Sequence, residues 1–292
     1  MYINKPKLTN IDLSKKHLTQ IDTKFFHRFI NLVRIDLSHN ELTFLDSKTF
    51  NGLVNLSFLS LSNNNLTRLD GKLLRGLTKL KGIWLSNNRL KYIDPKAFNG
   101  LTKLSEIWLN NNQIRVLDSM LLSGLVSLNK IYLAKNQLIY LDGKIFNGLK
   151  NLNYISISNN PLNRLNPRLF TGLVKLKGLW LSNIKLKFLD SKQFKGLVNL
   201  SFINLQQNLL EFVDPKTFQN LNMLTTIRLH ENKLTGDKLE LYLEKSVQFI
   251  SFKKLNENDI EFVVKPVGIY FLLKIINHSS VYLTVIFQEA RC

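Results

Sequence analysis

Residues 80–103 read LKGIWLSNNRLKYIDPKAFNGLTK, and the same pattern starts again at Leu104 without an insertion or deletion. The first leucine of the pattern recurs every 24 residues, at Leu8, Leu32, Leu56, Leu80, Leu104, Leu128, Leu152, Leu176, Leu200 and Leu224. A constant period of this length is typical of a solenoid, in which each repeat forms one coil and stacks on the next. The positions of each coil are numbered from this leucine, which is position 1.

The first half of each coil predicts a strand. Positions 4 and 6 are always Ile or Leu, as in Ile83 and Leu85, and this alternation indicates a short strand with one buried face. Stacked coils then form a parallel sheet. Position 9 is Asn in eight coils, where its amide can bond to buried backbone groups. The eighth coil has Ile184 instead, so we expect backbone groups there to lack their usual partner.

The second half of each coil predicts a turn. Asp94 and Pro95 are typical residues for the start of a helix, and Gly100 is typical of its end. We therefore expect one short helical or 3₁₀ turn on the outer face of each coil. Position 19 should form a buried spine of Phe26, Phe50, Phe98, Phe146, Phe170, Phe194 and Phe218, with Leu74 and Leu122 in two coils.

The combined pattern, LxxLxLxxNxL followed by LxxLxxxxFxGLxxL, resembles the 24-residue "typical" class of leucine-rich repeat. Slit proteins and Toll-like receptor ectodomains are built from this class. The resemblance implies an α/β solenoid, a horseshoe with a parallel inner β-sheet and short helical or 3₁₀ turns on its convex side. It also implies a binding module rather than an enzyme, in a secreted or cell-surface protein.

The repeats divide the chain into four segments. Residues 1–7 are a short N-terminal lead, and residues 8–236 are ten repeats. Residues 237–263 are expected to form a degenerate eleventh repeat, because Ile260-Glu-Phe-Val263 echoes Leu210-Glu-Phe-Val213. Residues 264–292 are a C-terminal cap or extension that the repeat pattern does not describe.

Composition and motifs exclude several classes of function. The formal net charge is +19, from 40 Lys and Arg against 21 Asp and Glu, which favours acidic partners. No phosphate-binding glycine loop, HExxH or GxSxG motif is present, so we expect neither catalysis nor a cofactor. A single cysteine, Cys292, cannot build a zinc site. No apolar run is long enough to predict a membrane span.

One acidic row has two interpretations. Position 15 is Asp in most coils, and these residues could form a ladder of calcium ligands. The alternative is that each Asp caps the turn that follows it. Capping is the interpretation we prefer, so no metal site is expected.

Aromatic residues gather at positions 3 and 5, which face the concave surface in a coil of this type. All three tryptophans are at position 5. Exposed Trp and Tyr are common in interaction surfaces. The alternative is that repeat duplication copied them, since KLKGIWLSN at 79–87 and KLKGLWLSN at 175–183 are nearly identical. The expected partner-binding residues are Phe58, Trp84, Glu106, Trp108, Tyr132, Tyr154, Trp180 and Phe202.

Basic residues form a second row at position 17, on the convex side. The row consists of Lys24, Lys48, Lys72, Lys96, Lys144, Arg168, Lys192 and Lys216. It has two interpretations: a solvated face, or a surface that binds a linear polyanion such as a sulfated glycan. Nucleic acid is less favoured, because no recognised nucleic-acid motif accompanies the charge.

Taken together, the residues predict a module that binds a protein on its concave face and is secreted or displayed at the cell surface. One alternative is a glycan-binding matrix or structural protein that uses the basic row. The other is an intracellular scaffold, since the chain shows no signal peptide and has one cysteine.

Overall fold

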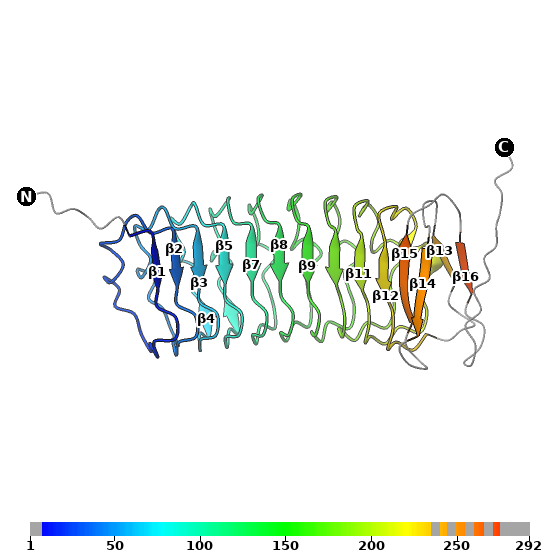
Figure 1. Cartoon of the computed structure of the whole chain (residues 1–292), viewed down its shortest axis with the longest axis horizontal. Helices are drawn as coiled ribbons and strands as arrows, with labels where there is room; N and C mark the ends of the chain where they lie inside the picture. Colours follow the sequence, from blue (N-terminus) through cyan, green and yellow to red (C-terminus); the bar gives the residue numbers. More distant parts are fainter. Residues whose placement is uncertain (1–7, 235–239, 244–248, 255–259, 266–270, 275–292) are drawn as a thin grey trace, which may run out of the picture. The chain divides into compact units, whose positions relative to one another are not determined.

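A computed structural model of the chain describes residues 8–234, 240–243, 249–254, 260–265 and 271–274 (Figure 1). Contacts divide the chain into two units. The first comprises Met1–Leu138 and Lys144–Leu152, and the second Ile139–Gly143 and Asn153–Cys292. The expected lead at 1–7 lies outside the described residues, and so does the segment 264–292 except for 264–265 and 271–274.

The first unit contains one short strand per coil. These strands are β1 (Asn10–Asp12), β2 (Arg34–Asp36), β3 (Phe58–Ser60), β5 (Gly82–Trp84), β7 (Glu106–Trp108) and β8 (Lys130–Tyr132). They pair in parallel and in chain order, with partners 24 residues apart, such as Ile83 and Ile107 (Figure 1). A second small parallel sheet joins β4 (Arg68–Leu69) to β6 (Tyr92–Ile93). The predicted solenoid of stacked coils is confirmed.

The second unit begins with the same construction. Its parallel strands are β9 (Tyr154–Ser156), β10 (Gly178–Trp180), β11 (Phe202–Asn204) and β12 (Thr226–Arg228). Beyond β12 the direction of pairing changes: β15 (Ile260–Lys265) pairs antiparallel with β12, and β14 (Phe249–Lys254) pairs antiparallel with β15. Much of the segment 237–263 lies outside the described residues, so the degenerate eleventh repeat stays a prediction. A separate antiparallel pair joins β13 (Glu240–Leu243) to β16 (Phe271–Lys274).

The core is built from the positions that the sequence indicates. The side chains at positions 4 and 6 are fully buried from the second coil onward, as at Ile35 and Leu37. Every residue of the expected phenylalanine spine is buried, and Phe194 stacks on Phe218 with ring centroids 5.9 Å apart. Because positions 4 and 6 point into this core, positions 3 and 5 point to the opposite side of the sheet. We call that side the open sheet face.

Most position-9 asparagines connect neighbouring coils within a unit. Asn88 Oδ1 accepts the N–H of Leu66, and its Nδ2 donates to the carbonyls of Leu61 and Leu85. The residue before each Asn makes the bend out of the strand, with φ between 50° and 56° at position 8 in all ten coils.

The backbone groups at the eighth coil lack the asparagine side chain, as expected, but they have other partners. Where Ile184 replaces Asn, the Leu162 N–H donates to the Asn160 carbonyl at 2.9 Å instead. The Ile184 carbonyl accepts the N–H of Asn163, which has a φ of 62°. A local turn of the backbone therefore replaces the missing side chain, and the Ile184 side chain is itself fully buried.

The turn side of each coil lies opposite the sheet. It carries i→i+3 hydrogen bonds, such as Ala97 N–H to the Asp94 carbonyl and Asn99 N–H to the Lys96 carbonyl. Among the described residues only Pro215–Phe218 (η1) is long enough to form a 3₁₀-helix, and the other coils carry single i→i+3 turns, in agreement with the expected short turn per coil. Within the described part of the chain no helix has the length and apolar character to span a bilayer.

Candidate functional site

The first aromatic group on the open sheet face joins the third and fourth coils. Phe58 stacks on Trp84, with ring centroids 5.7 Å apart and planes 17° from parallel. They are diagonal neighbours, at position 3 of one coil and position 5 of the next. Gly82 lies beneath them, and a Cβ there would lie 3.1 Å from Phe58 Cδ1. The guanidinium of Arg34 lies 5.6 Å from the Trp84 ring.

The next two coils add a polar network to the aromatic rings. Trp108 and Tyr132 are cross-strand partners with ring centroids 4.7 Å apart. The indole Nε1 of Trp108 donates to Glu106 Oε2 at 3.3 Å, and Lys130 Nζ contacts Glu106 Oε1 at 3.0 Å. Glu106 therefore fixes both an aromatic ring and a cation. Since Trp84 and Trp108 are also cross-strand partners, one row runs along the first unit.

The second unit carries a cluster of three rings. Trp180 lies between Tyr154 and Phe202, with centroid distances of 6.2 and 5.1 Å. Its ring covers Gly178, where a Cβ would lie 2.8 Å from Trp180 Cη2. Arg228 places its guanidinium 5.5 Å from the Phe202 ring.

We use two names for these groups. The aromatic row is Phe58, Trp84, Trp108 and Tyr132 in the first unit, and the three-ring cluster is Tyr154, Trp180 and Phe202 in the second. All seven rings are half-buried, because they pack on one another across the coils. Gly82 and Gly178 thus leave no empty notches beside the tryptophans, since the rings themselves fill that space. Each group still presents ring surface and charged neighbours to solvent.

Two arginines of this face were not singled out from the sequence. Arg34 is at position 3 and Arg228 is at position 5, which are the repeat positions of the aromatic residues. A search of positions 3 and 5 for charged residues would therefore have found them. Cation–π contacts of this kind contribute about 0.5–1 kcal/mol at exposed sites. The two arginines therefore add positive charge beside the aromatic rings of the open sheet face.

The first coil carries an acidic side chain at one of the same repeat positions. Asp12, at position 5, accepts the N–H of Ser14 at 2.8 Å, and this hydrogen bond lowers the pKa of the Asp12 carboxyl below its usual value. Asp12 is the cross-strand partner of Asp36. The open sheet face of the first unit is therefore acidic at its N-terminal end and basic where Arg34 and Lys130 flank the rings.

On the turn side, all eight position-17 cations are exposed. The position-15 side chains act as caps: Asp94 Oδ1 accepts the Lys96 N–H at 2.8 Å, and most coils repeat the bond. Within the described residues, no group of three or more His, Cys, Asp or Glu side chains is arranged to hold a metal ion.

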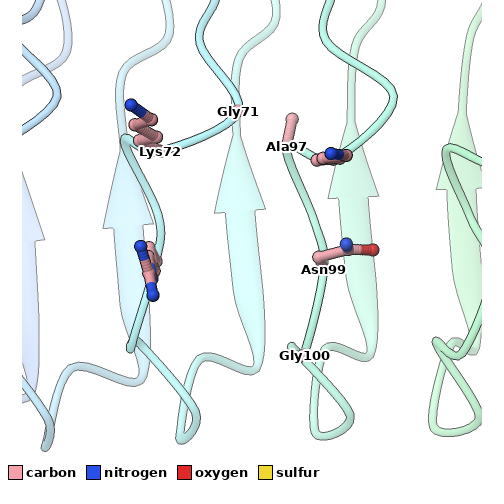
Figure 2. Close-up of a pocket in the computed structure, with 7 residues that line it drawn as sticks. Gly71, Lys72, Ala97, Asn99 and Gly100 are labelled. Carbon is pink, nitrogen blue, oxygen red and sulfur yellow. The ribbon is translucent and has the colours of Figure 1, made fainter.

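An open groove on the turn side lies between the third and fourth coils, with a volume of about 530 Å³ (Figure 2). It is lined by Gly71, Lys72, Arg75, Lys96, Ala97, Asn99 and Gly100. Two members of the basic row therefore meet at one groove together with Arg75, a residue that the sequence analysis did not select.

Comparison with solved structures places this chain among other leucine-rich repeat solenoids. A structure of the Drosophila Toll–Spatzle complex matches with a TM-score of 0.74 and 24% identity, over 80% of this chain and 31% of that one. A Leptospira interrogans leucine-rich repeat protein matches with a TM-score of 0.68 and 27% identity, over 75% and 53%. TLR13 in its complex with ssRNA13 matches with a TM-score of 0.63 and 26% identity, over 78% and 40%.

This chain thus spans between about a third and about half of the length of those chains. No curated protein matches it. The family described as leucine rich repeat matches residues 6–66, 55–114, 78–138, 126–183 and 175–234, which together cover most of the chain. The 24-residue period, the parallel strands and the asparagine ladder agree with that match: this chain belongs to the leucine-rich repeat family.

Proposed function

We propose that this chain is a non-enzymatic binding protein that holds a protein partner against its open sheet face. The observation that carries the proposal is the aromatic row, in which four half-exposed rings adjoin Arg34, Glu106 and Lys130. Water is a poor environment for so much ring surface, whereas Trp, Tyr and Arg dominate the energetics of protein interfaces. The three-ring cluster has the same character and is proposed as a second contact.

The similar structures support ligand binding by this fold. One of them is a complex of Toll with Spatzle, and another is a complex of TLR13 with RNA. We favour a protein partner because Glu106 contacts both Trp108 and Lys130 at the centre of the row. A carboxylate in that place would repel a phosphate backbone. By the same likeness, we propose a secreted or cell-surface protein.

The test uses the full chain as bait against a yeast-displayed library of secreted and cell-surface domains. Selected binders are then measured against Trp84→Ala/Trp108→Ala. The matched control is Phe44→Ala/Tyr92→Ala, which removes two exposed rings of the same unit away from the open sheet face. Circular dichroism spectra that match the parent would establish that both variants are folded.

We expect the tryptophan variant to lose affinity by about thirtyfold or more, the effect of truncating a hot-spot residue worth about 2 kcal/mol. The control should change affinity by less than about threefold. Binders that are lost in the control and kept in the tryptophan variant would overturn the proposal and move the site to the flank of the coils.

A further inference from the structure

Three basic side chains surround the groove on the turn side, and none of them is neutralised. Lys72 and Arg75 lie on the third coil and Lys96 on the fourth. In the part of the chain that the structure describes, no ion pair or hydrogen bond involves the side-chain nitrogen atoms of any of the three. All three are exposed. An anion in the groove would meet three cationic side chains at once.

The turns fix the backbone from which these side chains extend. The Arg75 N–H donates to the Lys72 carbonyl at 3.1 Å, and the Asn99 N–H donates to the Lys96 carbonyl at 3.1 Å. Side chains three residues apart in an i→i+3 turn eclipse one another, so each turn presents a pair of polar groups on the same side. Figure 2 shows Lys72 on one turn and Ala97 and Asn99 on the next.

The nearby acidic side chains, Asp70 and Asp94, are not among the residues that line the groove. Asp70 and Asp94 each accept the backbone N–H of the position-17 lysine, at 2.8 Å. Asp94 also packs closely against Gly71, where a Cβ would lie 2.6 Å from its Oδ1. These contacts direct one carboxylate oxygen of each Asp into its own coil, and neither acid lines the groove.

We propose that this groove binds a sulfate group of a sulfated glycan. Its volume of about 530 Å³ lies within the range of about 300–1,000 Å³ that is usual for small-ligand sites. Arg75 supplies a planar fork for two oxygens of the anion, and the lysines supply charge. The Asn99 amide can bond to a sugar hydroxyl. No aromatic ring lines the groove, so it offers no stacking surface for nucleobases. The same cation recurs at Lys24 and Lys48, as a linear polyanion requires.

The experiment compares two triple variants of the full chain. Lys72→Gln/Arg75→Gln/Lys96→Gln removes the groove cations. Lys192→Gln/Lys195→Gln/Lys216→Gln removes three exposed cations at the same repeat positions of the eighth and ninth coils, with the same change in net charge. Binding of a heparin hexasaccharide is measured by calorimetry at about 0.15 M salt, where charges further apart than about 8 Å are largely screened.

We expect the groove variant to lose affinity by about tenfold or more, since each charge-assisted hydrogen bond accounts for about tenfold. The control variant should lose less than about threefold. Equal losses would overturn the proposal, because they would show attraction to net charge alone. A single-stranded oligonucleotide that binds more tightly than the hexasaccharide, and is lost in the groove variant, would overturn it in favour of a nucleic-acid site.

Discussion

The side-chain amide of Asn88 donates a 2.9 Å hydrogen bond to the carbonyl of Leu61, which lies 27 residues earlier in the preceding coil. Its oxygen accepts the N–H of Leu66 in that same coil. One buried side chain therefore satisfies two backbone groups of the preceding coil, in addition to the Leu85 carbonyl of its own coil. The ladder joins neighbouring coils on the side of each strand where the chain leaves the sheet.

The first prediction tests this ladder. Asn88→Ala should lower the free energy of unfolding by about 2–4 kcal/mol, because a buried donor and a buried acceptor each lose their partner. The control is Asn51→Ala, which truncates an exposed asparagine on the turn side and should cost less than about 0.5 kcal/mol. Urea unfolding followed by circular dichroism gives both values. Similar midpoints for the two variants would contradict the ladder as a source of stability.

The second prediction concerns the coil that lacks the asparagine. Ile184→Asn should lower stability by about 1–3 kcal/mol, because the local groups already have partners and the new amide would be buried without them. Ile184→Val, which only shortens the side chain, should cost about 0.5–1.5 kcal/mol. If the Asn variant is instead more stable than the parent, the turn at Asn163 must revert to the geometry of the other coils.

The third prediction separates stability from binding at Trp108. Because this ring is half-buried and packs 4.7 Å from Tyr132, Trp108→Ala should cost about 1–2 kcal/mol of stability. Tyr92→Ala, which removes a ring that is 56% exposed, should cost less than about 0.5 kcal/mol. Thermal unfolding provides the comparison. Equal effects would mean that the aromatic row contributes nothing to the packing of the coils.

The fourth prediction concerns the two glycines beneath the rings. A Cβ at Gly178 would lie 2.8 Å from Trp180 and 2.9 Å from Tyr154, so Gly178→Ala should displace the indole. At Gly82 the nearest ring atom is 3.1 Å away, and Gly82→Ala requires a smaller movement. We expect Gly178→Ala to cost about 1–3 kcal/mol and to shift the tryptophan fluorescence, with a smaller effect for Gly82→Ala. A larger loss of stability for Gly82→Ala than for Gly178→Ala would contradict this account of the ring contacts.

Local sequence determined the coils of this protein and the side chains that they bury. The apolar residues at positions 1, 4, 6 and 11 and the phenylalanines at position 19 predict which side chains are buried, and the structure agrees at Ile83, Leu85 and Phe98. The capping role of Asp94 could also be predicted. These features depend on the spacing of residues within a single coil, and the period repeats that spacing along the chain.

Tertiary structure alone decided how side chains from different coils meet. The diagonal contact of Phe58 with Trp84 over Gly82, and the position of Arg34 beside that indole, depend on rotamers chosen across coils. The same applies to the groove that unites Lys72, Arg75 and Lys96. The antiparallel pairing of β12 with β15 follows no period at all. In each case the contacting groups are far apart in sequence, and their packing in space selects the arrangement.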